Sequence, residues 1–367
     1  MRVHPSQLVP GCMVLKDVMG KTNHPIIERN TVIKPIHMTV LHKFLVEEIE
    51  IGPKLASGEV FAPEEYIEED EESDDKKDFP KEITSFANQY LDAVQAYKNM
   101  FKNWQAGSSI DITKVRSTIV PLIELALRDK SQVFRLHHYS TKENYFYHHS
   151  IAVGLLSSII ANQMNYSHGE IIQIGLTGFL SDAGMSKVEE RILKKTGPLT
   201  AHEFEEVKKH PTHSYRLLEK IPVLKNEVRL GVLQHHERRD GSGYPIGLKE
   251  DKLYPYGKIV AVSDMYHAMT SERLYKTKKS PFKVVEEMMQ DQFGKFDHKV
   301  VQAFVDSMTN FTTGTKVKLS NNQEGEIVFI ESKTPTRPMV RLYHNDEIIH
   351  LKNYRDIFIE EIVTTPS

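Results

Sequence analysis

The sequence has only one cysteine, Cys12, among its 367 residues. A single thiol cannot form an internal disulfide or a thiolate metal cluster, so both kinds of cross-linked scaffold are excluded. We therefore expect a reducing, cytoplasmic setting for this chain. Any bound metal must be held by His, Asp and Glu side chains.

Long apolar runs are also absent. No stretch approaches the roughly 18 uninterrupted apolar residues of a membrane span, and residues 1–10 lack the apolar segment of a signal peptide. The net charge of −3 gives no sign of a strongly basic nucleic-acid binder. We therefore expect neither a membrane nor DNA as a partner.

The first eighty residues fall into two segments. Residues 1–62 alternate short apolar stretches with turn residues such as Pro10-Gly11, which predicts a small β-rich unit ending in a helix. Residues 63–80 contain the run Glu64–Asp78, with ten acidic residues and two lysines. This composition predicts a disordered acidic linker; the alternative is an acidic tail that binds a partner.

The rest of the chain changes its periodicity once. Apolar residues recur every three or four positions over 81–139, which predicts bracing helices, and residues 140–312 continue as consecutive helices. Thr200 and Glu203 form a capping-box sequence at the start of one of them. Over 313–367 the apolar residues alternate with period two, which predicts a small β-barrel-like unit. The expected fold class is mainly α, with small β-rich units at both ends. The clearest helices are expected at 145–163, 169–180, 225–236 and 257–269.

Histidines are concentrated in the helical block, where twelve of the eighteen lie between His137 and His298. A site for a hard divalent ion or iron needs neutral imidazoles and carboxylates that converge from several helices. The adjacent pair His235-His236 is informative, because neighbours on a helix point about 100° apart and share a cluster only at a helix end. By spacing alone, such a set could still arise by chance. The candidate ligands are His149, Asp182, His210, His235, His236 and Asp264.

The segment His235-His-Glu-Arg-Arg-Asp-Gly-Ser-Gly-Tyr-Pro245 closely resembles the signature of the HD-GYP family. Members of this family are bacterial metal-dependent phosphodiesterases that hydrolyse cyclic-di-GMP. The resemblance covers about residues 140–310 and implies an HD-superfamily helical bundle core. Other segments match in the same order: His148-His-Ser150, Leu180-Ser-Asp-Ala-Gly184, Lys209-His-Pro211, Ala261-Val-Ser-Asp264 and Ser271-Glu-Arg-Leu-Tyr-Lys276.

The resemblance implies a role for each candidate ligand. His149 and Asp264 correspond to ligands of one metal, and Asp182 corresponds to the catalytic aspartate that bridges two metals. His210, His235 and His236 correspond to the histidines of the second metal. In the family the metals, Fe, Mn or similar, lower the pKa of a shared water that attacks the phosphodiester.

Substrate contacts are implied in the same way. Arg273 and Lys276 match basic positions that hold the substrate phosphates, a role suited to a guanidinium fork and a point charge. Tyr244 belongs to the GYP loop, which in the family contributes to substrate and partner recognition.

Three positions depart from the family pattern. The histidine of the HD dyad is Ser181, the lysine expected three residues after the aspartate is Met185, and the glutamate that some members carry is Tyr145. A serine hydroxyl stays protonated and ligates poorly, so we expect one tight metal and a second that is weak or absent. Tyr145 argues against a third metal. Met185 lacks the positive charge that is worth a few kcal/mol in the transition state.

Other histidines have plainer interpretations. We expect His137 and His138 to lie on the surface, and His148 and His213 to be non-ligands; the role of His267 is open. The alternative for the six candidate ligands is that a decayed family member keeps some of them for hydrogen bonds in its core.

Two functions are consistent with these residues. One is a cyclic-di-GMP phosphodiesterase that hydrolyses weakly or not at all because Ser181 and Met185 replace His and Lys. The other is a catalytically inactive receptor or scaffold that binds signalling proteins through the GYP loop. A related cyclic dinucleotide as ligand and a homodimer stay open. Outside Glu64–Asp78 the chain carries +5, which suits an anionic ligand.

Overall fold

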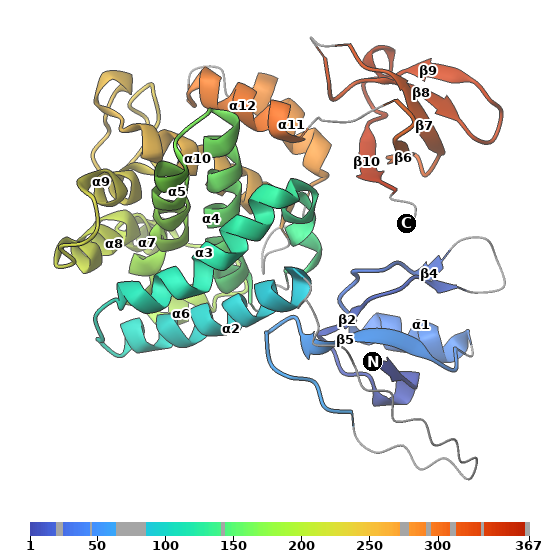
Figure 1. Ribbon diagram of the computed structural model, residues 1–367, viewed down its shortest axis with the longest axis horizontal. Coiled ribbons are helices and arrows are strands. Elements are labelled where there is room, and N and C mark those ends of the chain that lie inside the picture. Colours follow the sequence, from blue (N-terminus) through green and yellow to red (C-terminus); the bar gives the residue numbers. More distant parts are fainter. Residues whose placement is uncertain are drawn as a thin grey trace.

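The computed structural model describes residues 1–19, 25–44, 46–63, 86–140, 144–271, 279–290, 295–308, 313–331 and 334–363. The acidic run Glu64–Asp78 lies outside these residues, as do Arg273 and Lys276. Figure 1 shows a large helical part, with the small β units from the two ends of the chain lying beside the same side of it. The fold is mainly helical, as expected.

The helical part begins after the acidic run. The helix expected at 145–163 has those bounds, and the predicted capping box is present, since Thr200 and Glu203 each accept a hydrogen bond from the other's backbone amide. The helices are α2 (Phe86–Gln105), α3 (Ile112–Arg128), α4 (Tyr145–Gln163), α5 (His168–Leu180), α6 (Glu190–Leu193), α7 (Ala201–Val207), α8 (His210–Glu219), α9 (Asn226–Gln234), α10 (Pro255–Thr270), α11 (Pro281–Gln290) and α12 (His298–Met308).

Helices α4 and α5 form the centre of this part, and their backbones come unusually close. A Cβ atom on Gly178 would lie 2.8 Å from the Val153 carbonyl oxygen, and one on Gly154 would lie 2.9 Å from the Gly175 carbonyl oxygen. Larger side chains would push the helices apart, because protein interiors have no spare volume. The contact therefore fixes the distance between the middle of α4 and the C-terminal half of α5.

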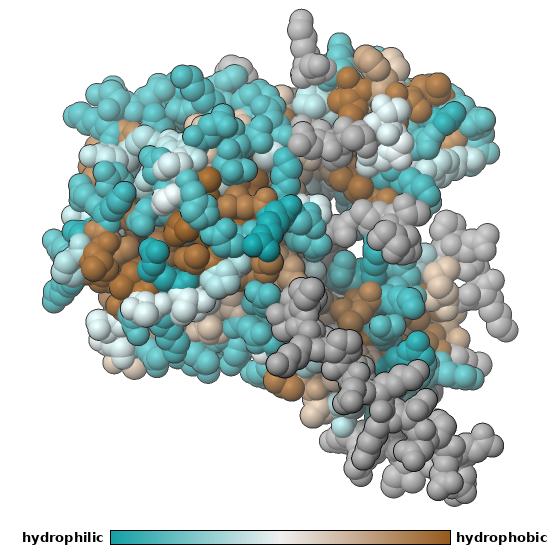
Figure 2. All heavy atoms as spheres, in the orientation of Figure 1, coloured by the Kyte–Doolittle hydropathy of each residue, from teal (hydrophilic) through white to brown (hydrophobic). Residues whose placement is uncertain are grey.

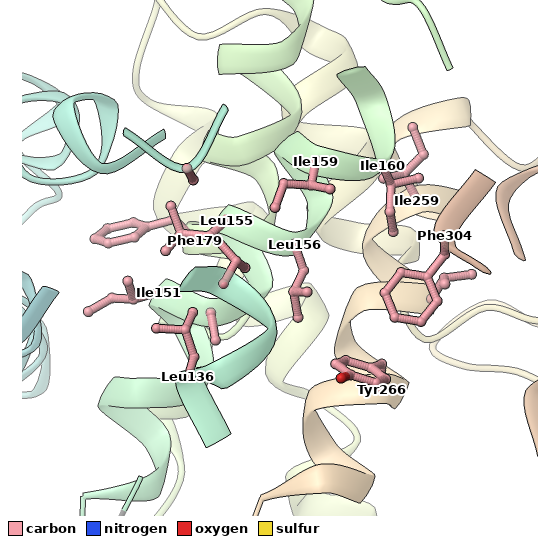
Figure 3. Close-up of a cluster of buried hydrophobic side chains, with 14 of the residues drawn as sticks. Leu136, Ile151, Leu155, Leu156, Ile159, Ile160, Phe179, Ile259, Tyr266 and Phe304 are labelled. Atoms are coloured by element: carbon pink, nitrogen blue, oxygen red, sulfur yellow. The ribbon is translucent and has the colours of Figure 1, made fainter. Parts of the chain in front are cut away.

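The surrounding core is apolar and comes from several helices. Figure 3 shows Leu155 of α4, Phe179 of α5, Ile259 of α10 and Phe304 of α12 gathered in one cluster. Tyr97 of α2 packs edge-on against Phe179, with ring centroids 4.9 Å apart. Helices α2 and α3 therefore pack on the outside of the α4–α5 pair.

The N-terminal β unit has its own small core, in which Cys12 is fully buried. Strands β1, β5 and β2 form an antiparallel sheet in that order, and β3 pairs with β4. The elements are β1 (Arg2–Val3), β2 (Cys12–Val14), β3 (Val18–Met19), β4 (Pro25–Ile27), α1 (Pro35–Lys43) and β5 (Ile49–Leu55).

The C-terminal β unit is an antiparallel sheet with the order β10-β6-β7-β8-β9. In the described residues β9 and β10 are not paired with each other, so this sheet is open, where a barrel-like unit was expected. Arg337 attaches it to the helical part through an ion pair with Glu286 of α11. The strands are β6 (Lys316–Leu319), β7 (Glu324–Phe329), β8 (Met339–Leu342), β9 (Ile348–His350) and β10 (Ile359–Ile362).

The surface of the helical part is mixed in polarity. Figure 2 shows hydrophilic side chains over most of the visible face, with apolar side chains in a band across its middle. Apolar atoms make up more than half of the accessible surface of an ordinary folded protein, so apolar side chains at the surface are expected. Within the part of the chain that the structure covers, no helix combines the length and the apolarity needed to cross a bilayer.

The N-terminal β unit is joined to α4 by a buried histidine. His148 Nε2 donates to the Ala56 carbonyl oxygen at 2.8 Å, and its Nδ1 lies 3.0 Å from the Tyr90 hydroxyl. Burial lowers the pKa of His148 to about 4, so the ring is neutral and Nδ1 accepts from Tyr90. His148 is therefore a structural joint between the loop after β5 and the helices α2 and α4.

Gly58 gives a test of this joint. Its φ is +84°, and a Cβ atom there would lie 2.4 Å from the Leu91 carbonyl oxygen of α2. Gly107 has a similar φ of +95° but no heavy atom within 4 Å of the same position, so Gly107→Ala is a matched control for backbone strain. We expect Gly58→Ala to lower the free energy of unfolding by about 1–3 kcal/mol more than Gly107→Ala, because only Gly58 adds overpacking. Urea unfolding followed by the fluorescence of Trp104, the single tryptophan, measures both losses; equal losses would contradict tight docking.

Candidate metal centre

The six candidate ligands come from five separate places in the helical part and meet at one point. They form two groups that share Asp182, and within each group one ligand atom per residue lies within 4.8 Å of the others. The four-donor group is Asp182, His210, His235 and His236. The three-donor group is His149, Asp182 and Asp264.

Helix ends deliver most of these side chains. Asp182 is the second residue after the end of α5, and His210 is the first residue of α8. Helix α9 ends at Gln234, so His235 and His236 leave it together and both reach the cluster. The sequence-based expectation that this pair can share a cluster only at a helix end is therefore confirmed.

The four-donor group has an arrangement that fits a cation. His210 Nδ1 donates to the Val207 carbonyl oxygen and His235 Nδ1 donates to the Val232 carbonyl oxygen, both at 2.7 Å. Because Nδ1 of each ring bonds to its own backbone, Nε2 is the atom that each ring turns toward the cluster, and the two Nε2 atoms lie 3.2 Å apart. A cation placed between them could be ligated by both rings. These residues fit a divalent metal ion.

Asp182 links the two groups with different oxygens. Its Oδ1 lies 3.1 Å from His210 Nε2, and its Oδ2 lies 3.4 Å from His149 Nε2. His149 Nε2 is also 3.0 Å from Asp264 Oδ1. This carboxylate is therefore placed as a bridge would be, with one oxygen toward each group.

Ser181 adds no donor to the three-donor group. Its hydroxyl donates to the Gly178 carbonyl oxygen at 2.8 Å, within the last turn of α5. Its own carbonyl oxygen accepts a hydrogen bond from the Ser214 hydroxyl at 2.7 Å. Ser181 is buried and fully used in holding the backbone.

The charges at the cluster suit metal binding. Burial alone would raise the pKa of Asp182, but the imidazoles of His210, His235 and His149 close to its oxygens hold that pKa well below its usual range. The pKa of Asp264 is lowered as well, against the effect of burial, by the nearby His236 and the hydrogen bond with His149. Burial and the neighbouring His235 lower the pKa of His236. Ionised carboxylates and neutral imidazoles are the forms that ligate metals.

Two residues behind His149 were not recognised from the sequence as its partners. The Tyr145 hydroxyl and His267 Nδ1 lie 3.0 Å and 2.9 Å from His149 Nδ1, opposite the nitrogen that faces the carboxylates. Such partners fix the ring orientation of a ligating histidine. The available signal was helical spacing, since Tyr145 lies four residues before His149 and His267 lies three residues after Asp264.

A cavity of about 620 Å³ opens onto the cluster. This volume lies within the range of about 300–1,000 Å³ that is usual for small-molecule sites. Met185 lines the cavity, as does Tyr244, whose ring stacks on His236 with centroids 4.7 Å apart. Many of the other lining residues are apolar, among them Ile192, Leu193, Pro198, Leu199, Phe204 and Val207.

Comparisons with known proteins point to one family. A family model described as HD domain matches residues 131–300. A Pseudomonas aeruginosa protein named cyclic di-GMP phosphodiesterase PA4108 is 31% identical over 251 residues, 68% of this chain and 60% of that protein. A Thermotoga maritima protein named cyclic di-GMP phosphodiesterase is 41% identical over 160 residues, 43% of each chain. The solved structure of Bd1817, an HDG"Y"P protein from Bdellovibrio bacteriovorus, has a TM-score of 0.50 at 14% identity over 84% of this chain and 99% of that one, a likeness of fold.

The chain matches the HD-domain family model and is similar to proteins named as cyclic di-GMP phosphodiesterases. It spans about half the length of the curated relatives that it matches. The HD-GYP family is metal-dependent, and the His/Asp cluster could bind metal. Ser181 lies next to Asp182 of this cluster, and Met185 lines the cavity that the cluster faces.

The loop that gives the HD-GYP family its name is held by a buried carboxylate that sequence reasoning missed. Glu237 accepts hydrogen bonds from the backbone amides of Ile246, Gly247 and Leu248, at 2.7 to 3.0 Å. The side chain is 2% exposed, so these bonds are protected from water. Glu237 follows directly after His236, and the loop is therefore tied to the metal cluster.

We expect Glu237→Gln to loosen this loop. The amide keeps the size and one acceptor oxygen but loses the charge, and hydrogen bonds to a charged group contribute about 1.5–3 kcal/mol. Amide hydrogen exchange in residues 242–248 should become about tenfold faster or more. Glu250→Gln is the matched control, since Glu250 pairs with Arg239 at the surface. Unchanged exchange in the Glu237 variant would show that the carboxylate does not hold the loop.

Proposed function

We propose that this HD-GYP protein binds cyclic-di-GMP, or a related cyclic dinucleotide, at the metal centre and hydrolyses it weakly or not at all. The observation that carries the proposal is the convergence of six His and Asp side chains on a cavity large enough for a small molecule. The names of the P. aeruginosa and T. maritima relatives support the substrate class. The incomplete donor set supports the low rate.

The metal content follows from the donors. The four-donor group would hold one ion tightly, whereas the three-donor group would hold a second, such as Fe or Mn, weakly or not at all. When bound, the ions would activate water and polarise the phosphodiester. Asp182 serves both groups, one oxygen to each, so it is the residue on which the whole site depends.

Met185 separates binding from chemistry. Its side chain is 6% exposed and lines the cavity, where the family has a lysine that faces the phosphate. A thioether supplies no charge to the developing charge of the transition state, but it can pack against a base. Affinity for a dinucleotide can therefore persist while the rate falls.

The second candidate function is a receptor or scaffold without turnover. Two observations favour it: the hydroxyl of Ser181 is committed to the Gly178 carbonyl, and Met185 adds no charge to the cavity. In this case the ligand, or a signalling protein at the GYP loop around Tyr244, would be bound and released unchanged.

Metal analysis tests the donor argument. We expect protein purified under anaerobic conditions to retain about one tightly held ion per chain, because only one group has four donors. Ser181→His should raise the content toward two ions, and Asp182→Ala should lower it toward none. Mass spectrometry of the metal content measures all three proteins. Two tightly held ions in the wild-type protein would be inconsistent with a weak second site.

A turnover assay separates the two functions. Mn²⁺-loaded protein is incubated with cyclic-di-GMP, and linear products are separated by chromatography. Slow hydrolysis that Asp182→Ala abolishes identifies an enzyme, whereas binding without any product identifies a receptor. Placing the family residues with Ser181→His and Met185→Lys should raise the rate by about two orders of magnitude. Each ~1.4 kcal/mol of transition-state stabilisation raises the rate about tenfold, and the added ligand and charge are worth a few kcal/mol. Ser181→His with Met265→Lys is the matched control, because Met265 also lines the cavity; an equal gain in the control would contradict a specific role for position 185.

A further inference from the structure

One charged side chain in the cavity has no role in the site described so far. Arg238 is the only lysine or arginine among the described residues that line the cavity. It stands two residues after the candidate ligand His236 and one after Glu237, which holds the loop. We propose that Arg238 binds a phosphate of the ligand and supplies the positive charge that Met185 lacks; the inference rests on the proposed function.

The guanidinium is held in place on one side only. Its Nη1 donates to the carbonyl oxygens of His235 and Glu237, at 3.3 Å and 2.9 Å. Its central carbon lies 4.8 Å from the centre of the Phe296 ring, a cation–π contact. Among the described residues, its Nε and Nη2 make no hydrogen bond. A rigid fork with two donors still available is suited to an anion such as phosphate.

The electrostatic setting favours an anionic ligand. Arg238 is largely withdrawn from water, and this burial lowers its pKa, although the nearby Asp264 and Tyr244 act in the opposite direction. A guanidinium nevertheless stays protonated in proteins. A partly desolvated cation gains more from a phosphate than an exposed one does, because the surrounding dielectric is low. Once metal ions balance Asp182 and Asp264, no further carboxylate among the described residues lines the cavity to compete for Arg238.

The neighbouring Arg239 shows what a purely structural arginine looks like here. Its Nη2 pairs with Glu250 at 2.6 Å, and its Nη1 donates to the Phe296 carbonyl oxygen at 3.3 Å. It does not line the cavity. Arg239→Met therefore removes the same charge at the adjacent position and is the matched control for Arg238→Met.

Isothermal titration of the Mn²⁺-loaded full chain tests the inference with three probes: cyclic-di-GMP, inorganic phosphate and guanosine. Arg238→Met should weaken cyclic-di-GMP and phosphate binding about 10- to 100-fold, as loss of a charged hydrogen bond implies. The affinity of Arg238→Lys for these two probes should lie between those of Arg238→Met and the wild type, because lysine keeps the charge but loses the planar fork of donors. Guanosine has no phosphate, so its affinity should stay unchanged. The affinity of Arg239→Met for each probe should stay within about twofold of the wild-type value.

Each contrary result has a distinct meaning. Equal affinity of Arg238→Met and wild type for both phosphate-bearing probes overturns the inference, as does wild-type protein that binds neither. A parallel loss of guanosine affinity or of metal content in Arg238→Met also overturns it, since the arginine would then support the loop and not the phosphate. Protein that binds phosphate through Arg238 but does not bind cyclic-di-GMP overturns the proposed function and leaves Arg238 as a phosphate site.

Discussion

The close approach of helices α4 and α5 at Gly154 and Gly178 is the constraint on which the metal centre depends. His149 stands on α4 five residues before the first glycine, and Asp182 stands four residues after the second. Any residue with a Cβ at these positions would move the two ligands relative to each other. The other ligands arrive on α8, α9 and α10, and α10 packs against both central helices. The packing of the helix backbones therefore determines how far apart the candidate ligands lie.

Much of the fold and the set of His and Asp side chains that converge could be predicted, because their signals are local in the sequence. Periodicity predicted the helix at 145–163, and the adjacent histidines predicted a cluster at a helix end. The interactions missed were those that depend on distant contacts. Glu237 meets the loop amides nine to eleven residues later, and His267 of α10 contacts both His149 and Tyr145 of α4. The strand order of the C-terminal sheet could not be predicted for the same reason, since strand periodicity does not fix which edges pair.

Ser181 and Met185 are both accommodated by packing and local hydrogen bonds. Ser181 has its hydroxyl and its carbonyl in hydrogen bonds, so it leaves no unsatisfied polar group beside Asp182. Met185 is buried and lines the cavity together with other apolar side chains. Neither residue brings a metal donor or a positive charge to the cavity, and Arg238 is the one lysine or arginine among the described residues that line it.

The hydrogen bonds of His210 and His235 to carbonyl oxygens only three residues earlier have a consequence for metal uptake. Each ring is held in orientation by a contact within its own stretch of chain, independent of the rest of the cluster. The Nε2 atoms of both rings therefore face the other donors before any ion arrives, and an ion that enters need not rotate either imidazole.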